Sequence, residues 1–535
     1  MNTIINQIQQ YIANNQLQKA QQVTVQLIEK TPENLYLHKL LAHIHGLKEE
    51  SLKAIQILEK QLIKFPDDFD LNNNLGHYYF KAEDIEKSDF FIQKAKKINP
   101  DSPSPSQNAA ELYLFMRKFD LAQQEIDHCL EINEAKFQDY LFYIPALLVK
   151  IFILIAQKKQ MEAVEFIKKY LKINFNAELF LQLIQIDKKA VDPDLINHCK
   201  QQIEKKSYNS KMEIFQHLVP LYFSLALYYE KEDSNLSDEF YVKANKEIFS
   251  IQRLNMVQLQ KQELQYMNTY KEIHQIKNLN SQQGEDNIFI VGLPRSGTTL
   301  LESVVTANKE VFAGGELNIF KNLLLNHLTD EKELTAENLL MIGEKYISAT
   351  NQLKKEFTQI VDKLPMNSSY IGFILKSLPA SKILLILRNP WDVAISLFKQ
   401  RYVRHVPYSS SFFNIGVQVA NFEASILSWL QYDDIKEKIF IVKYEELVSD
   451  MSNQREKIYQ FCKIHEEYNA SIREGFFAQT ASMNQVQKGI HQSSIKKDNF
   501  SLFYAEFYDA FNSQRDYWKK QGLAIPSDYF GYILK

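Results

Sequence analysis

A segment that could bind an anionic group lies just past the middle of the chain. Residues 288–301 read IFIVGLPRSGTTLL, a short apolar run followed by a glycine-bounded loop and then a run typical of a helix. Gly292 and Gly297 stand where the glycines of the phosphate-binding pattern G-x-x-x-x-G-K-[ST] would stand, and Thr299 takes its final hydroxyl position. Backbone N–H groups at the start of a helix bind anionic oxygens whatever molecule carries them. The loop is therefore expected to bind a phosphate-like group.

The loop departs from the nucleoside-triphosphate pattern at one position. Thr298 stands where the pattern has the lysine that reaches the β- and γ-phosphates, and the positive charge of the loop is Arg295 instead. ATP or GTP with Mg²⁺ is therefore not the expected ligand. A P-loop kinase or nucleoside-triphosphatase that lacks this lysine is the alternative reading of the loop taken by itself.

A second segment could bind a phosphomonoester. Residues 382–399, KILLILRNPWDVAISLFK, predict a buried strand over 383–387, a turn, and a helix that begins near Trp391. Arg388 ends the strand and Ser396 lies in the helix. A bidentate arginine with a hydroxyl suits a phosphate group. The alternative is an arginine at a sheet edge and a serine packed within a helix.

Together with residues 361–367 (VDKLPMN) and 439–447 (IFIVKYEEL), these segments resemble the sulfotransferases that use 3′-phosphoadenosine 5′-phosphosulfate (PAPS). The likeness is greatest to the protein-tyrosine and the tetratricopeptide-repeat sulfotransferases, and it covers roughly 286–497. It implies a three-layer, P-loop-like α/β domain with a mostly parallel sheet, and transfer of a sulfuryl group from PAPS to a hydroxyl. It implies PAPS as co-substrate and no metal.

The resemblance also implies which residues bind the donor. The 5′-phosphosulfate would be bound by Arg295, Ser296, Gly297, Thr298 and Thr299. The 3′-phosphate would be bound by Arg388 and Ser396. A third cation of some relatives falls on Gln400, where Lys399 or Arg401 could substitute. Residues 439–447 read as a core strand with Tyr444 at its end, and that tyrosine would contact the nucleotide.

A further loop would close over the adenosine and the 3′-phosphate. Residues 480–497, TASMNQVQKGIHQSSIKK, resemble the closing loop of the repeat-containing members. Its expected ligands are Ser482, Gln485, Lys488 and Lys497. The segment departs from the family pattern, because Gly489 stands where proline is common and the tryptophan usual after the Lys497 region is absent.

The resemblance places the acid–base chemistry on two residues. Glu316, within VFAGGELNIF, falls where the tyrosine sulfotransferases have the glutamate that takes the proton from the acceptor. Lys363 matches the lysine that stabilises charge on the bridging oxygen. Small-molecule sulfotransferases use a histidine near this lysine, but residues 361–367 have none, which favours Glu316. The alternative role for Glu316 is that of an acidic residue at a helix start, and His327 and His405 are outside candidates.

A 34-residue period organises the first part of the chain. Pro32, Pro66 and Pro100 are 34 residues apart, which is the period of tetratricopeptide repeats. Small residues follow the same step at Ala20, Ala54, Ser88 and Ala122. Ala163 comes seven residues late, so an insertion is expected before it. The pattern predicts helical hairpins stacked as a solenoid.

Three regions are predicted: a repeat solenoid over 1–185, further repeat-like helices and a linker over 186–280, and the PAPS-dependent domain over 285–535. The apolar run 140–156 is shorter than the roughly 20 residues of a membrane-spanning helix, so it is expected to be a buried helix. The N-terminal residues show no signal peptide. A cytoplasmic location is the default expectation, and the secretory pathway stays open.

Composition narrows the class of protein. The net charge of −3, with 45% hydrophobic and 24% charged residues, is typical of a soluble globular protein and argues against a nucleic-acid binder. The three cysteines are too widely spaced for a metal site or a disulfide framework. The repeats are expected to bind a protein partner or to mediate oligomerisation, and the sequence does not decide between these roles or predict an oligomeric state.

These observations predict a sulfotransferase that acts on a hydroxyl of a protein or peptide, tyrosine among the candidates, or of a carbohydrate. Two alternatives stay open. One is a repeat scaffold with a catalytically inactive nucleotide-binding domain, and the other is a P-loop kinase or nucleoside-triphosphatase fused to repeats.

Overall fold

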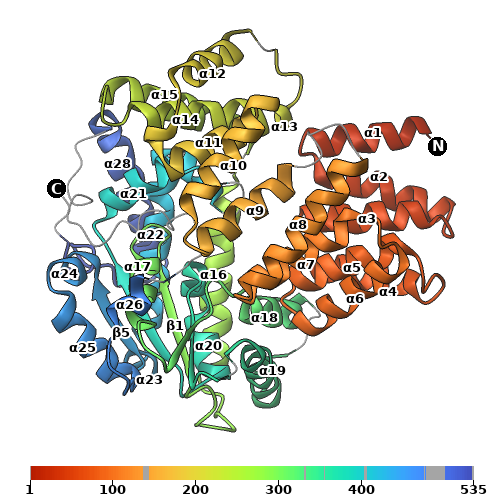
Figure 1. Ribbon diagram of the computed structural model, residues 1–535. Helices are drawn as coiled ribbons and strands as arrows, with labels where there is room; N and C mark the ends of the chain where they lie inside the picture. The colour runs from red at the N-terminus through yellow and green to blue at the C-terminus, as the bar shows by residue number, and fades with distance from the viewer. Residues whose placement is uncertain are drawn as a thin grey trace. The chain divides into compact units, whose positions relative to one another are not determined.

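The computed structural model describes residues 2–136, 144–205, 207–252, 254–329, 333–354, 356–402, 406–474, 476 and 500–532. The chain forms two compact units, Met1–Glu247 and Ile248–Lys535. The first consists of helices, and the second has a sheet with helices around it (Figure 1). Helix α16 (Met256–Ile273), which the sequence analysis grouped with the linker, belongs to the second unit. The predicted boundaries at 185 and 280–285 stay predictions.

The first unit begins with stacked helical hairpins (Figure 1). The hairpin helices are α1 (Asn2–Ala13), α2 (Leu17–Lys30), α3 (Leu35–Leu47), α4 (Ser51–Leu62), α5 (Phe69–Lys81), α6 (Ile85–Ile98), α7 (Pro103–Phe115), α8 (Phe119–Lys136), α9 (Ile144–Ala156) and α10 (Gln160–Ile173). The helices that follow are α11 (Ala177–Ile186), η2 (Lys188–Ala190), α12 (Pro193–Lys205), α13 (Lys211–Glu213), η3 (Ile214–Leu218), α14 (Val219–Tyr229) and α15 (Ser234–Ile251).

The column of small residues marks where the two helices of a hairpin approach closely. Its members in α2, α4, α6, α8 and α10 are all fully buried: Ala20, Ala54, Ser88, Ala122 and Ala163. In one hairpin the Ser88 hydroxyl donates to the carbonyl of Gly76 at 2.8 Å. A Cβ on Gly76 would lie 2.7 Å from Ile92. The period read from the sequence therefore reflects helix contacts, and the predicted repeat solenoid is confirmed.

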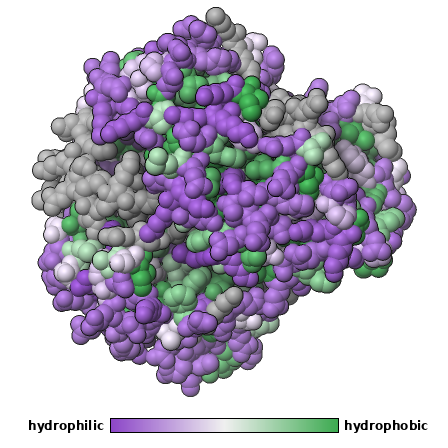
Figure 2. All heavy atoms as spheres, in the orientation of Figure 1, coloured by the Kyte–Doolittle hydropathy of each residue, from purple (hydrophilic) through white to green (hydrophobic). Residues whose placement is uncertain are grey.

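The predicted buried helix within 140–156 is present as α9, most of whose side chains are buried. Residues 137–143 lie outside the described part of the chain, and the insertion predicted before Ala163 stays a prediction. None of the helices that the structure describes is long and apolar enough to cross a membrane. Hydrophilic residues cover most of the face shown in Figure 2, and apolar residues appear on it in small groups.

The second unit is built on a five-stranded parallel sheet. Its strands are β1 (Asn287–Gly292), β2 (Val311–Ala313), β3 (Gln359–Asp362), β4 (Lys382–Leu387) and β5 (Ile439–Lys443), in the order β2-β3-β1-β4-β5. The predicted strands at 288 and 383–387 are confirmed. The strand predicted over 439–447 is shorter, because helix α24 (Tyr444–Ser449) begins at the tyrosine. Glu445 and Glu446 lie in its first turn, where acidic residues favour a helix start.

Helices cover both faces of this sheet. They are α16, α17 (Thr298–Val305), α18 (Ile319–Thr329), α19 (Ala336–Lys354), η4 (Pro365–Tyr370), α20 (Ile371–Ser377), α21 (Pro390–Phe398), η5 (Pro407–Ser410), α22 (Phe412–Trp429), α23 (Asp433–Lys436), α24, α25 (Met451–Cys462), α26 (Ala470–Glu474), η7 (Ser501–Phe503) and α28 (Tyr504–Lys520). On one face, Ile288 and Ile290 of β1 pack with Leu301 of α17 and Ile458 of α25. Phe289, which points the other way, lies 5.5 Å between ring centroids from Tyr346 of α19. The predicted three-layer arrangement is confirmed.

Helix α16 supports the segment that follows Lys363. The ring of Tyr270 in α16 lies edge-on to Trp429, with 5.2 Å between centroids. The Glu263 carboxylate accepts a hydrogen bond from the Ser369 hydroxyl of η4 at 2.7 Å. Burial raises the pKa of Glu263 from 4.5 to about 7, although the hydrogen bond from Ser369 opposes the shift. The folded unit therefore favours the protonated form of this carboxyl group.

We predict that Glu263→Gln stabilises the protein at pH 8 and changes its stability little at pH 5. Because the folded-state pKa is raised, wild-type stability falls as the pH rises from about 4.5 through about 7. Glutamine stays neutral, and its amide oxygen still accepts from Ser369. Melting temperatures at the two pH values test this, with the exposed Glu272→Gln of the same helix as control. An equal change at both pH values would contradict it.

Candidate active site

Each of the five strands leads at its carboxyl end into one of the residues singled out from the sequence. These residues are Arg295 after β1, Glu316 after β2, Lys363 after β3, Arg388 after β4 and Tyr444 after β5. In a parallel sheet these ends meet at one edge, and that edge is where such sheets bind their ligands. The sheet topology therefore gathers segments that are up to about 150 residues apart in sequence.

The anion loop between β1 and α17 has an unusual backbone. Arg295 has a φ of +72° and Gly297, which caps α17, has a φ of +107°. A Cβ on Gly297 would lie 2.5 Å from the ring of Tyr444. Ser296 and Thr299 are buried, as is Thr298. Only glycine fits at 297, since the position needs both the left-handed conformation and the missing side chain.

Two buried arginines join three strand ends. The Arg295 Nε donates to the Ser396 hydroxyl at 3.1 Å, and Nη1 of Arg388 donates to the carbonyl of Arg295 at 3.2 Å. The Arg388 guanidinium lies 4.4 Å from the ring centroid of Tyr444. Burial lowers the pKa of Arg295, and the charge of Arg388 acts in the same direction while Tyr402 opposes it. Both arginines stay charged, so this edge of the sheet attracts anions.

Glu316 and Lys363 form an ion pair at the neighbouring strand ends. The Lys363 Nζ lies 2.7 Å from Oε1 of Glu316, with the lysine side chain fully buried and that of the glutamate 44% exposed. The backbone N–H of Lys363 donates to the carbonyl of Gly315 at 2.8 Å. The Gly315 N–H in turn donates to Glu302 of α17 at 3.0 Å. The backbone hydrogen bonds of Lys363 and of Gly315, which precedes Glu316, therefore help to hold the predicted cation and the predicted base together.

Two side chains at this edge, the fully buried Glu302 and the partly buried Tyr402, were missed by the sequence analysis. Glu302 is fully buried although it is charged, and its position within the apolar start of α17 was the available signal. Tyr402 follows α21, and its hydroxyl oxygen is buried with no hydrogen-bond partner among the described atoms. Burial raises the pKa of Tyr402, while Arg295 lowers it and Glu316 raises it. The phenol thus lies within electrostatic reach of both groups, and no motif marked it.

Other predicted residues lie elsewhere or outside the described chain. The Gln400 side chain donates to the carbonyl of Arg401 at 3.2 Å, and the Lys399 ammonium lies 5.5 Å from the ring centroid of Phe500. The third phosphate cation therefore stays a prediction. Buried His327 contacts the carbonyl of Glu333 at 3.0 Å. Five predicted residues fall outside the described segments: His405, Ser482, Gln485, Lys488 and Lys497.

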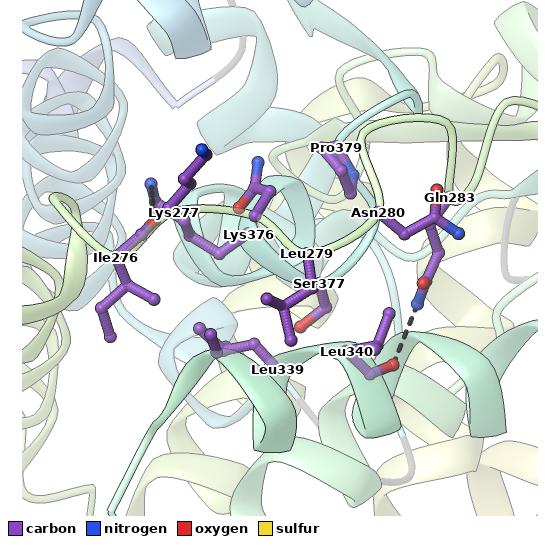
Figure 3. Close-up of a pocket in the computed structure, with 12 residues that line it drawn as sticks. Ile276, Lys277, Leu279, Asn280, Gln283, Leu339, Leu340, Lys376, Ser377 and Pro379 are labelled. Atoms are coloured by element: carbon purple, nitrogen blue, oxygen red, sulfur yellow. Dashed lines mark hydrogen bonds between the residues drawn. The ribbon is translucent and has the colours of Figure 1, made fainter.

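Two hollows of this unit lie at the opposite, amino end of the strands. One, lined by Gln283, Leu340 and Lys376, encloses about 10 Å³, which is room for about one water (Figure 3). A groove of about 620 Å³ lies along residues 280–287 and one side of α19. We place the candidate site at the carboxyl ends instead, because the buried cations and the anion loop lie there.

The three cysteines of the chain lie in the described segments, and their thiols are buried. These segments contain no group of three or more His, Cys, Asp or Glu side chains that could bind a metal ion. Cys129, Cys199 and Cys462 are buried and free, and burial raises the pKa of each thiol to about 12.

Comparison with known families agrees with this geometry. Residues 287–468 match the sulfotransferase family, and residues 69–102 match the tetratricopeptide repeat. The second unit contains a sulfotransferase domain. Its matched segment spans all five strands, and the matched repeat coincides with helices α5 and α6. The chain thus joins a repeat solenoid to a sulfotransferase domain.

Known proteins match part of this chain at low identity. An uncharacterized protein of Aquifex aeolicus (strain VF5) is 29% identical over 232 residues, which are 39% of this chain and 30% of that protein. A protein-tyrosine sulfotransferase of Drosophila melanogaster is 25% identical over 201 residues, which are 34% of this chain and 40% of that protein. The chain therefore spans less than half the length of either relative. A solved sulfotransferase of Alicyclobacillus acidocaldarius aligns with 14% identity and a TM-score of 0.26, over 44% of this chain and 98% of that one.

We predict that Gly297→Ala lowers stability by about 1–3 kcal/mol more than Gly522→Ala does. Both glycines have positive φ, so alanine is strained at either position, but nothing lies within 4 Å of the Cβ site at Gly522. The difference between the variants isolates the overlap with Tyr444. Denaturant unfolding of both variants measures it, and equal losses would show that the loop can move away from the ring.

Proposed function

We propose that this sulfotransferase domain moves a sulfuryl group from PAPS to an acceptor hydroxyl. The observation that carries the proposal is the contact that joins the anion loop to the second phosphate motif, Arg295 to Ser396 and Arg388 to Arg295. A donor with phosphate groups at both its 5′ and 3′ positions matches two such motifs held side by side. The family match supports the reaction class.

The donor would be bound by residues of two strand ends. The loop residues that would bind the 5′-phosphosulfate are Arg295, Ser296, Gly297, Thr298 and Thr299. Arg388 and Ser396 would bind the 3′-phosphate, and Tyr444 would contact the nucleotide from its place against Arg388. Ser482, Gln485, Lys488 and Lys497 remain predicted ligands of the closing loop.

Both residues of the Glu316–Lys363 ion pair would take part in the transfer step. The acceptor oxygen attacks sulfur, an oxygen–sulfur bond forms, and the bond from sulfur to the bridging oxygen of the donor breaks. Glu316 takes the acceptor proton, and Lys363 with Arg295 offsets the charge on the departing adenosine 3′,5′-bisphosphate. Since Glu316 is half-exposed while Lys363 is fully buried, the base faces the side from which an acceptor arrives. The acceleration would come from positioning and fixed charge.

Tyr402 is an additional candidate for contact with the transferred group. Leaving a phenol hydroxyl buried without a partner costs about 1–3 kcal/mol, which a phenylalanine would avoid. The hydroxyl lies within electrostatic reach of Arg295 and Glu316, the two groups between which the sulfuryl group would pass. We propose that it donates a hydrogen bond to a sulfuryl oxygen.

For the acceptor, we propose a hydroxyl of a protein or peptide, with tyrosine as the first candidate. The printed name of the Drosophila relative and the interaction role typical of tetratricopeptide repeats support this choice. A carbohydrate hydroxyl is the second candidate. An inactive nucleotide-binding scaffold and a P-loop kinase are the alternatives, and the threonine at 298 disfavours the kinase. A cytoplasmic location stays a prediction.

We predict tight binding of adenosine 3′,5′-bisphosphate by the wild-type chain, at least tenfold weaker binding by Arg388→Ala, and no binding of ATP. The expected loss follows from removing a charged hydrogen-bond donor, at about 1.5–3 kcal/mol. Calorimetry with the full chain measures it. Binding of ATP in place of the bisphosphate, or of neither, would overturn the proposed function.

We predict that Tyr402→Phe slows sulfuryl transfer about tenfold or more while leaving thermal stability unchanged or raised. The probe reaction is hydrolysis of PAPS, with water as acceptor, followed by release of the bisphosphate. Tyr408→Phe is the matched control, because its hydroxyl is also buried without a partner in the described structure, next to Tyr402. Equal slowing by both variants, or none by Tyr402→Phe, would contradict the proposed contact.

A further inference from the structure

The last described segment of the chain returns to the sheet after α28. Arg515 of α28 forms a buried bidentate ion pair with Glu423 of α22, at 2.8 and 3.1 Å. Its Nη2 also donates to the carbonyls of Pro526 and Asp528. One buried guanidinium therefore fixes the path of the backbone that follows the helix, because its Nε donates to Glu423 and the two hydrogens of Nη2 are shared among Glu423 and the two carbonyls.

A tight turn then places the side chain of Tyr532. The backbone groups of Tyr529 and Tyr532 bond to each other in both directions, at 3.1 and 2.8 Å, and Gly531 between them has a φ of +84°. Tyr529 is almost fully buried, with its ring centroid 6.0 Å from that of Phe511. The turn is therefore anchored to α28 by an aromatic side chain as well as by Arg515.

Tyr532 reaches the carboxyl ends of β4 and β5 through Glu445. Its hydroxyl donates to Oε2 of Glu445 at 2.5 Å, and Oε1 of the same carboxylate accepts from the backbone N–H of Asn389 at 3.1 Å. Asn389 directly follows Arg388 and caps helix α21 with its own side chain. Glu445 directly follows Tyr444, whose ring lies against Arg388. The carboxylate thus ties the C-terminal turn to the backbone on both sides of the Arg388 contact.

We infer that the segment 528–532 is a positioning strap for the 3′-phosphate site, acting through Glu445 on Asn389 and Arg388. The inference rests on the proposed function, because it is the 3′-phosphate of the donor that Arg388 would bind. Tyr532 and Glu445 are positioning residues here, and neither needs to touch the donor. Helix α21 carries Ser396, so the same contact also orients the second expected ligand of that phosphate.

A contact with a 3′-phosphate requires the Arg388 side chain to lose conformational freedom, and this is the physical reason for a strap. Arg388 lies at the start of a turn, and its guanidinium must keep its place while the backbone between β4 and α21 could shift. A carboxylate bonded to both a backbone N–H and a phenol removes that freedom before the donor binds, which is preorganisation of the site. Burial and the Glu445 carboxylate raise the pKa of Tyr532, so the phenol remains a donor through the physiological range.

The test compares two nucleotides that differ only at the 3′ position. Calorimetry with the full chain measures the affinities of adenosine 3′,5′-bisphosphate and adenosine 5′-monophosphate for wild type and for Tyr532→Phe. We expect the variant to bind the bisphosphate about three- to tenfold more weakly than wild type, because one charge-assisted hydrogen bond is lost indirectly. We expect the affinity for the monophosphate to equal that of wild type. Tyr517→Phe is the control, because it removes a phenol of α28 for which no hydrogen bond is described.

Two substitutions of Glu445 distinguish the loss of the strap from general damage to the fold. In Glu445→Gln the amide oxygen still accepts from Asn389, so the bisphosphate affinity is expected to fall less than in Glu445→Ala. Equal losses for both nucleotides, or no loss for the bisphosphate, would overturn the strap while leaving the proposed function in place. A wild-type chain that binds both nucleotides equally would overturn the proposed function and the strap with it.

Discussion

The burial of two guanidinium groups at one edge of the sheet is the constraint on which the catalytic unit depends. A buried charge is costly unless its donors find acceptors. Here Arg295 donates to Ser396, Arg388 donates to the backbone of Arg295, and the ring of Tyr444 covers the Arg388 guanidinium. Each of these contacts requires β1, β4 and β5 to keep their order, so the sheet and the anion site stabilise one another.

Carboxylates play the complementary part around this edge. Glu302 holds the backbone next to Glu316, and Glu445 holds the backbone next to Arg388. Each of these carboxylates accepts a hydrogen bond from a backbone N–H. The site therefore combines buried positive groups, which attract anions, with carboxylates that fix the loops around it.

The division of the chain into two units separates two kinds of stabilisation. The hairpins of the first unit are held by close helix contacts at positions such as Ala54 and Ser88, where a larger side chain would not fit. The second unit is held by an alternating sheet core and by aromatic packing around Trp429 and Tyr270. The sequence period therefore predicts the fold of the first unit, whereas sequence motifs predict that of the second.

The sequence by itself determined the features that are local in the chain. The strand and loop that end at Gly297, and the strand and helix on either side of Arg388, could be predicted because each depends on neighbouring residues in the sequence. The 34-residue step could be predicted because the same helix contact recurs in each hairpin. The predicted core strands were found, and only the end of the strand before Tyr444 differed, where two glutamates favour a helix. The roles assigned to the site residues stay predictions.

Only the tertiary structure decided which of these segments meet. The contact of Lys363 with Glu316 joins residues 47 apart, and that of Tyr532 with Glu445 joins residues 87 apart. Tyr402 and Tyr532 carry no local signature, since each looks in sequence like any other aromatic residue. Glu302 has one local signal, its place within the apolar start of α17. Their environment is set by the strand order β2-β3-β1-β4-β5 and by the return of the chain after α28. Those arrangements arise from long-range packing, which sequence spacing does not encode.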